Sequence, residues 1–203
     1  MLKNLLGNYK IVLGSQSPRR QQLLKAMDIP FTTITTNIDE TYPAHLPILK
    51  IPLWIAKQKA LYLEKFMQNN WILITADTIV VLQDKILGKP KDLREAKEFL
   101  RLLSGKKHFV ITGIFIKTKI KEKSLTCRTS VWVKNLTEQE INYYINTYKP
   151  LDKAGAYGIQ EWIGFIGIKK IDGEYNNVVG LPTQKLYVVL YNLLINLKKT
   201  INK

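Results

Sequence analysis

The chain has 203 residues, of which 46% are hydrophobic, and its formal net charge at pH 7 is +15. This length predicts one globular domain or two lobes that share one core. The longest apolar run, residues 71–82, contains Asp77 and is too short to cross a bilayer. The N-terminus lacks the apolar core of a secretory signal, and the single cysteine, Cys127, fits a reducing compartment. We therefore expect a cytoplasmic protein without a membrane partner.

The positive charge has two interpretations. It indicates either an anionic partner, a nucleotide or a nucleic acid, or a lysine-rich surface without a specific role. A nucleic-acid-binding protein typically gathers its basic residues with aromatic residues on one face, whereas the lysines here recur along the whole chain. We therefore expect surface composition to explain most of the charge and do not expect nucleic acid as a partner.

Strands and helices are predicted to alternate through the first half of the chain. In order, the patterns predict a strand at residues 9–14, a helix at 18–27, a strand at 31–36, a helix at 52–67 and a buried strand at 71–82. A turn is expected at residues 83–85.

The second half mixes a hairpin with further helices. A capping box at residues 92–95 predicts a helix that ends near Gly105, and a second box at 137–140 predicts one that stops before Pro150. Residues 108–120 and 125–133 are expected to form a hairpin, residues 162–171 a strand, and residues 183–198 a helix. Its expected apolar side consists of Leu186, Val189, Leu190, Leu193, Leu194 and Leu197. Crossovers combined with hairpins predict an α/β fold with a mixed sheet.

The segment Gly-Ser-Gln-Ser-Pro-Arg-Arg, residues 14–20, joins the first predicted strand to the first predicted helix. Ser17 is the expected N-cap and Pro18 the first helical residue. Free backbone N–H groups at a helix start favour anions, so the two arginines of the first turn, Arg19 and Arg20, are unfavourable there unless a polyphosphate binds. The alternative is that both arginines face solvent.

Asp77 interrupts the apolar run at residues 71–82. An isolated carboxylate in a buried strand costs free energy unless it is paired or binds a metal. Asp77 is therefore a candidate to hold Mg²⁺ or to accept a proton from an attacking water. The alternative is an aspartate in a turn between two short strands.

Two loops present lysines. Gly88-Lys89-Pro90 is a tight turn and not a Walker A loop, and by itself it favours a solvated lysine. Residues 152–160, Asp-Lys-Ala-Gly-Ala-Tyr-Gly-Ile-Gln, contain small residues that let the backbone approach a ligand. Lys153 suits phosphate, and Gln160 both donates and accepts hydrogen bonds, which suits a base edge. An ordinary glycine-rich connection is the alternative.

Two weaker candidates lie in the first half of the chain. Glu40, in the pair Asp39-Glu40, is a candidate second metal carboxylate, although surface acidic pairs are common. Lys59 lies on a predicted helix and is a candidate phosphate contact, although most helix lysines are not.

In their order, and together with Leu103-Ser104-Gly105 and residues 179–182, these motifs resemble the Maf family over about residues 10–195. The resemblance implies a nucleoside triphosphate pyrophosphatase with the fold of the inosine triphosphatase superfamily. That fold is an elongated mixed β-sheet with flanking helices and a central cleft, so residues 1–203 are expected to form one catalytic domain with two lobes. The resemblance also implies Mg²⁺ or Mn²⁺ as cofactor, a homodimer, and a role in cleansing the nucleotide pool.

The resemblance assigns roles to individual residues. It implies Asp77 as proton acceptor, Glu40 and Asp77 as metal ligands, and Lys59, Lys89 and Lys153 as phosphate contacts. As a hypothesis for the mechanism, we expect the triphosphate to lie across the loop that carries Ser15, Ser17 and Arg20. Arg19, Thr78 and Gln160 match the specificity positions of the branch that acts on dTTP and UTP, and not those of the branch that acts on 7-methyl-GTP. Glu161 departs from the pattern, because many relatives have glycine after the glutamine.

Three alternatives remain open at this point. The chain is a related triphosphatase with another base preference, a basic nucleic-acid-binding protein without enzymatic activity, or an inactive interaction protein of the same fold.

Overall fold

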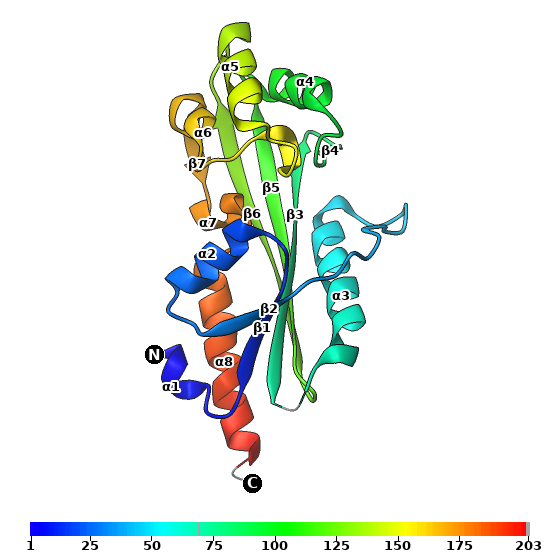
Figure 1. The fold of residues 1–203 in the computed structure, drawn as a ribbon, viewed down its shortest axis with the longest axis vertical. Helices are drawn as coiled ribbons and strands as arrows, with labels where there is room; N and C mark the ends of the chain where they lie inside the picture. Colours follow the sequence, from blue (N-terminus) through cyan, green and yellow to red (C-terminus); the bar gives the residue numbers. More distant parts are fainter. Residues whose placement is uncertain (69, 202–203) are drawn as a thin grey trace. The chain divides into compact units, whose positions relative to one another are not determined.

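The structure is a computed structural model that describes residues 1–68 and 70–201 (Figure 1). The chain divides into two compact units. The first comprises Met1–Asp77, Thr112–Thr126 and Gly180–Lys203, and the second comprises Thr78–Ile111 and Cys127–Val179. The prediction of a single catalytic domain with a cleft between two lobes stays a prediction.

The first unit contains most of the N-terminal elements and the last helix. Its elements are α1 (Leu2–Leu5), β1 (Lys10–Gly14), α2 (Pro18–Ala26), β2 (Phe31–Ile34), η1 (Ile48–Lys50), α3 (Ile51–Leu63), η2 (Glu64–Phe66), the first half of β3 (Trp71–Leu82) and α8 (Thr183–Ile201). It also holds the turn that joins β5 (Lys107–Lys117) to β6 (Glu122–Val133).

The second unit contains the remaining parts of β3, β5 and β6. Its other elements are β4 (Lys85–Leu87), α4 (Leu93–Leu103), α5 (Glu138–Tyr148), η3 (Ala154–Ala156), α6 (Trp162–Gly167), β7 (Ile168–Asp172) and α7 (Tyr175–Val179).

Over the described residues the strands form one seven-stranded sheet in the order β2-β1-β3-β5-β6-β7, with β4 paired to β3. β1 is parallel to both β2 and β3, whereas β4 is antiparallel to β3, and β7 is antiparallel to β6. The predicted α/β fold with a mixed sheet and flanking helices is therefore confirmed. None of the helices described in this chain has the length and apolar character that crossing a membrane requires.

The alternation of side chains along β3 assigns each residue to one of two layers of the first unit. Ile72, Ile74 and Ala76 pack into the hydrophobic cluster that includes α8, whereas Leu73 packs against α3. In Figure 1, α3 and α8 lie on opposite sides of β3. Because successive strand residues point to opposite faces, Asp77 lies on the α3 face of the strand, as Leu73 does.

The last helix matches its predicted apolar face. Five of the six predicted residues are buried, and Val189 is partly buried against the same cluster. The buried residues are Leu186, Leu190, Leu193, Leu194 and Leu197.

Both predicted capping boxes begin helices. Thr137 and Glu140 form the full reciprocal pair at the start of α5. At α4, Asp92 accepts a hydrogen bond from the Glu95 N–H at 2.8 Å, but the Glu95 carboxylate accepts from the Lys91 N–H, outside the box. In each helix the N-cap side chain therefore satisfies one N–H group of the first turn, that of Glu95 in α4 and that of Glu140 in α5.

Two predicted elements differ in the structure. The strand expected at residues 162–171 is wrong in its first part, because residues 162–167 form α6 and only Ile168–Asp172 form β7. An apolar run of this length fits both periodicities. A Cβ at Gly164 would lie 2.0 Å from the Ile159 carbonyl oxygen, so glycine allows α6 to pack directly on the preceding loop. The turn expected at residues 83–85 includes Lys85, which instead begins a further strand, β4, that was not expected.

Candidate active site

The loop between β1 and α2 begins at a position where only glycine fits. A Cβ on Gly14 would lie 2.7 Å from side-chain atoms of both Leu63 and Thr75, so the absent side chain lets α3 and β3 approach β1 closely. Ser15 follows and is buried, and its Oγ accepts a hydrogen bond from the Ser17 N–H at 3.2 Å. Ser17 is the N-cap residue, as predicted.

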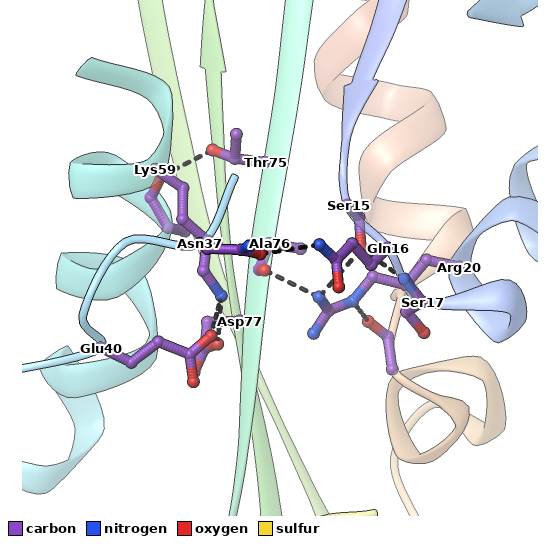
Figure 2. Close-up of polar contacts among 12 residues, drawn as sticks. Ser15, Gln16, Ser17, Arg20, Asn37, Glu40, Lys59, Thr75, Ala76 and Asp77 are labelled. Carbon is purple, nitrogen blue, oxygen red and sulfur yellow. Dashed lines mark hydrogen bonds and ion pairs between the residues drawn. The ribbon is translucent and has the colours of Figure 1, made fainter. Parts of the chain in front are cut away.

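Arg20 extends from α2 to three acceptors in the first unit (Figure 2). Its Nε donates to the Gly180 carbonyl at 2.9 Å, and its Nη1 donates to the Ala76 carbonyl at 2.8 Å and to Ser15 Oγ at 3.4 Å. The interpretation in which Arg20 faces solvent is therefore wrong. Burial lowers the pKa of Arg20, while the charges of Asp77 and Glu40 oppose this shift, and an arginine stays protonated under such conditions.

Lys59 occupies a core position of α3. Its neighbours one turn away on the same face, Ala56 and Leu63, are fully buried, and only 11% of the Lys59 side chain is exposed. A lysine at such a position requires partners for its charge. Its Nζ lies 2.8 Å from Asp77 Oδ1 and 2.6 Å from Glu40 Oε1. Figure 2 shows the Lys59 side chain pointing toward both carboxylates.

Asp77 lies inside the continuous strand β3, so the interpretation as an aspartate in a turn between two short strands is wrong. Its side chain is 10% exposed, compared with 44% for Glu40. Burial raises the pKa of the Asp77 carboxyl, and the nearby Glu40 adds to this, whereas Lys59 and Arg20 lower it. Burial dominates, because a carboxylate loses hydration in the interior. Asp77 therefore has the environment of a proton acceptor.

The carboxylates of Glu40 and Asp77 converge on the same ammonium group and come from different elements. Hard divalent cations such as Mg²⁺ favour carboxylate oxygens, and Mg²⁺ is commonly held by one or two carboxylates together with substrate phosphates and water. The described residues contain no group of three or more histidine, cysteine, aspartate or glutamate side chains placed to hold a metal. The pair fits such a cation only if other oxygens complete its coordination.

In the second unit, the two lysine loops contact each other. The Gly155 N–H donates to the Gly88 carbonyl at 3.0 Å, which joins the loop of residues 152–160 to the Gly88-Lys89-Pro90 turn. Gly155 has a φ of +69°, and a Cβ there would lie 3.0 Å from Val80. Glycine therefore serves both the backbone conformation and the packing at this position.

The predicted site residues of the second unit differ in exposure. Lys89 and Gln160 are exposed, and Thr78 is half-buried. Lys153 is buried, with its Nζ 2.7 Å from Asp152 Oδ1 and 3.0 Å from Glu161 Oε1.

The structure thus brings part of the predicted set together in the first unit. Direct contacts join Ser15 to Ser17 and Arg20, and Lys59 to Glu40 and Asp77. Arg19 is half-buried in the same helix as Arg20.

Sequence reasoning missed two polar contacts around these residues. Asn37 accepts a hydrogen bond from Gln16 Nε2 at 2.9 Å, and nothing in its local sequence indicates this. Tyr144, in α5, donates to the Glu161 carboxylate. Its position on the buried stripe with Ile141 and Ile145 was the available signal, because a tyrosine hydroxyl in a core needs a partner.

Comparison with known proteins identifies the family. A model of the Maf-like protein family matches residues 10–193, and the chain belongs to this family. It is 50% identical over 188 residues to a dTTP/UTP pyrophosphatase of Parabacteroides distasonis, which covers 92% of this chain and 97% of the relative. It is 48% identical over 193 residues to a dTTP/UTP pyrophosphatase of Bacteroides thetaiotaomicron, covering 93% of this chain and 100% of the relative.

A solved structure of a nucleoside-triphosphatase, a dITP/XTP pyrophosphatase from Mycobacterium abscessus, aligns with part of this chain. The alignment covers 63% of this chain and 75% of the Mycobacterium abscessus chain. The TM-score is 0.39 and the identity 12%.

Proposed function

We propose that this protein hydrolyses dTTP and UTP to the nucleoside monophosphate and pyrophosphate. The observation that carries the proposal is the buried Asp77 carboxylate, which lies 2.8 Å from Lys59 Nζ and has a pKa raised by burial. The relatives named dTTP/UTP pyrophosphatase, at 48–50% identity over nearly their whole length, support the choice of substrate.

In the proposed reaction, Asp77 accepts a proton as water attacks the α-phosphorus. A bond forms between the water oxygen and the α-phosphorus, the bond from the α-phosphorus to the oxygen that bridges to the β-phosphorus breaks, and pyrophosphate leaves with that oxygen. A carboxyl with a raised pKa is suited to this task, because efficient general bases have a pKa near the working pH.

Positively charged side chains and hydrogen-bond donors of one loop bind the negatively charged triphosphate. We assign this role to Arg20 and Lys59, with the hydroxyls and N–H groups of the Ser15–Ser17 loop. Arg20 is already anchored to two backbone carbonyls, so little conformational entropy is lost when it meets a phosphate. The roles of Lys89 and Lys153, which belong to the second unit, rest on the family motifs.

Glu40 and Asp77 would hold a divalent cation, Mg²⁺ or Mn²⁺. Such an ion, when bound, offsets negative charge on the triphosphate and on the departing pyrophosphate. The structural support is the convergence of both carboxylates on Lys59 Nζ, at 2.6 and 2.8 Å. Without the ion, the Lys59 ammonium offsets part of the charge of the pair.

Base selection is assigned to Arg19, Thr78 and Gln160. A site that hydrogen-bonds a substrate group discriminates strongly against analogues that lack it. Following the family resemblance, we further propose that the protein is a cytoplasmic homodimer that removes non-standard nucleotides from the pool, and sedimentation at several concentrations tests the dimer.

The experiment that tests the proposed function is pyrophosphate release from a panel of nucleoside triphosphates, with identification of the nucleotide product. We expect dTTP and UTP to yield monophosphate and pyrophosphate faster than GTP, ATP and 7-methyl-GTP. Chelation should abolish the release, and Mg²⁺ or Mn²⁺ should restore it. A preference for inosine or xanthosine triphosphate would refute the base assignment, and no cleavage of any nucleotide would refute the reaction.

A further inference from the structure

The Glu161 carboxylate joins three separate segments of the second unit. One oxygen, Oε1, lies 3.0 Å from Lys153 Nζ, at the start of the loop of residues 152–160. The other, Oε2, accepts a hydrogen bond from the Tyr144 hydroxyl of α5. Glu161 itself is the N-cap residue of α6. Both oxygens are therefore engaged, each by a different segment.

Both partners of the Glu161 carboxylate are hydrogen-bond donors. Burial raises the pKa of the Tyr144 hydroxyl, and the hydrogen bond to Glu161 raises it further, so the hydroxyl stays protonated and donates. The Lys153 ammonium can only donate. A carboxylate at position 161 serves both donors, whereas an amide would have one oxygen acceptor for the two.

The same carboxylate lies against the turn that leads to Gln160. A Cβ on Gly158 would lie 2.8 Å from the Glu161 Cδ, so the absent side chain provides the space in which the carboxylate sits. The Gly158 N–H donates to the Tyr144 hydroxyl at 3.0 Å, and the Glu161 N–H donates to the Gly158 carbonyl at 3.0 Å. Tyr144, Gly158 and Glu161 therefore form a closed set of hydrogen bonds around this turn.

The Lys153 ammonium has two carboxylate partners. One is Glu161, which belongs to this set of hydrogen bonds, and the other is Asp152, at 2.7 Å. The Lys153 side chain is 9% exposed, so its long stem is packed and the ammonium has little freedom to search for other partners. Asp152 is the neighbour of Lys153 in sequence and belongs to the same loop, whereas Glu161 connects the ammonium to α5 through Tyr144. Glu161 is thus the partner that ties Lys153 to another element of the unit.

We propose that Glu161 is a positioning residue for Lys153, which it orients for contact with the substrate phosphates. This inference rests on the proposed function, in which Lys153 contacts phosphate. Glu161 acts through Lys153 and not by contact with the substrate. Loss of its carboxylate charge removes one of two charged ion-pair partners of Lys153 and leaves Asp152, and misplacement of a positioning group by about 1 Å can cost about 100-fold in rate.

The test is a double-mutant cycle of Glu161→Gln and Lys153→Met, with kcat/KM for dTTP as the readout. We expect Glu161→Gln to lower kcat/KM by about 10- to 100-fold in the otherwise unchanged protein. In the Lys153→Met background the same substitution should change kcat/KM by less than about threefold, because there is then no ammonium at position 153 for Glu161 to orient. A purely structural role would instead produce a similar loss in both backgrounds.

Three further variants sharpen the result. Tyr144→Phe removes the link to α5 and should lower kcat/KM in the same direction as Glu161→Gln. Glu161→Asp keeps the charge and should recover part of the loss. Glu98→Gln, at an exposed position of α4, is the matched control and should leave kcat/KM unchanged.

The activity of the wild-type protein separates a wrong role for Glu161 from a wrong function for the whole protein. If the wild-type protein cleaves dTTP, two results would overturn the role of Glu161 alone. One is a wild-type kcat/KM in Glu161→Gln, and the other is an equal loss of kcat/KM in both backgrounds. Wild-type protein that cleaves no nucleoside triphosphate would overturn the proposed function itself. Thermal unfolding of each variant identifies any that fail to fold, and Glu161→Asp then carries the comparison.

Discussion

Lys59 Nζ and Asp77 Oδ1 lie 2.8 Å apart in the interior of the first unit, one on a helix and the other on a strand. The contact requires a lysine on the buried face of α3 and a carboxylate on the α3 face of β3. The two positions must lie opposite each other where the helix packs on the strand. Breaking a buried ion pair by removing one partner costs about 3–5 kcal/mol, because the other charge is left uncompensated. A pair with this cost is expected where the charges serve a function, and each partner is open to a direct test.

Asp77→Asn should lower turnover of dTTP by about 10²- to 10⁴-fold or more, because the proton acceptor and a metal ligand are lost together. The measurement is kcat from product formation at saturating dTTP. Asp84→Asn, in the exposed turn after β3, is the control and should retain full turnover. Near-normal turnover of Asp77→Asn would show that another group takes the proton.

Lys59→Met should shift the acid limb of the pH profile of kcat/KM to higher pH. Lys59 lowers the pKa of Asp77, so its removal raises that pKa, and a higher pH is then needed to keep the base ionised. The profile is measured with dTTP between about pH 5 and 9. Lys57→Met, on the exposed side of the same helix, should leave the profile in place. An unshifted limb in Lys59→Met would mean that Asp77 does not set it.

Gln160→Glu should weaken the use of dTTP and UTP much more than it changes the dependence on Mg²⁺ or Mn²⁺. The substitution replaces the amide donor with an acceptor, so the base loses a hydrogen bond and meets a negative charge. The readout is kcat/KM for each nucleotide at several metal concentrations, with Gln139→Glu at an exposed position of α5 as the control. An equal loss for every nucleotide would contradict a role in base selection.

His108 should make the stability of the protein depend on pH. It is fully buried, its Nε2 lies 2.8 Å from the Tyr157 hydroxyl, and burial lowers its pKa from 6.5 to about 4. The unfolded chain therefore takes up the proton near pH 6.5 and the folded chain only near pH 4. Protonation in this window favours unfolding, so the free energy of unfolding should fall by about 3 kcal/mol as the pH drops from 6.5 to 4.

The measurement for His108 is denaturant unfolding at several pH values across that window. His108→Gln should lose most of this pH dependence, although it lowers stability overall because it disturbs a buried contact. The exposed His45→Gln is the matched control and should keep the wild-type slope. An identical slope in wild type and His108→Gln would contradict the assignment.

The sequence by itself determined the elements whose signals are local. The caps at Asp92 and Thr137, the leucine stripe of α8 and the predominantly apolar run of β3 are each visible as a pattern within one element, so the spacing of residues was sufficient. The order of the motifs was also sufficient to indicate the Maf family. At residues 162–167 the local signal failed, because an apolar run satisfies helix and strand equally and the packing of Gly164 on the Ile159 carbonyl decided for a helix.

Only the tertiary structure decided which charged groups meet. Glu40 and Lys59 were the least secure of the predicted residues. The local sequence of a helix or a loop does not indicate which lysine faces a carboxylate on another element. The Arg20 guanidinium reaches the Gly180 carbonyl across 160 positions of sequence, and Lys59 of α3 reaches Asp77 of β3 across 18. Such contacts arise because packing sheets against helices brings distant segments to a common point, where a buried charge is stable only if an opposite charge or a donor lies beside it.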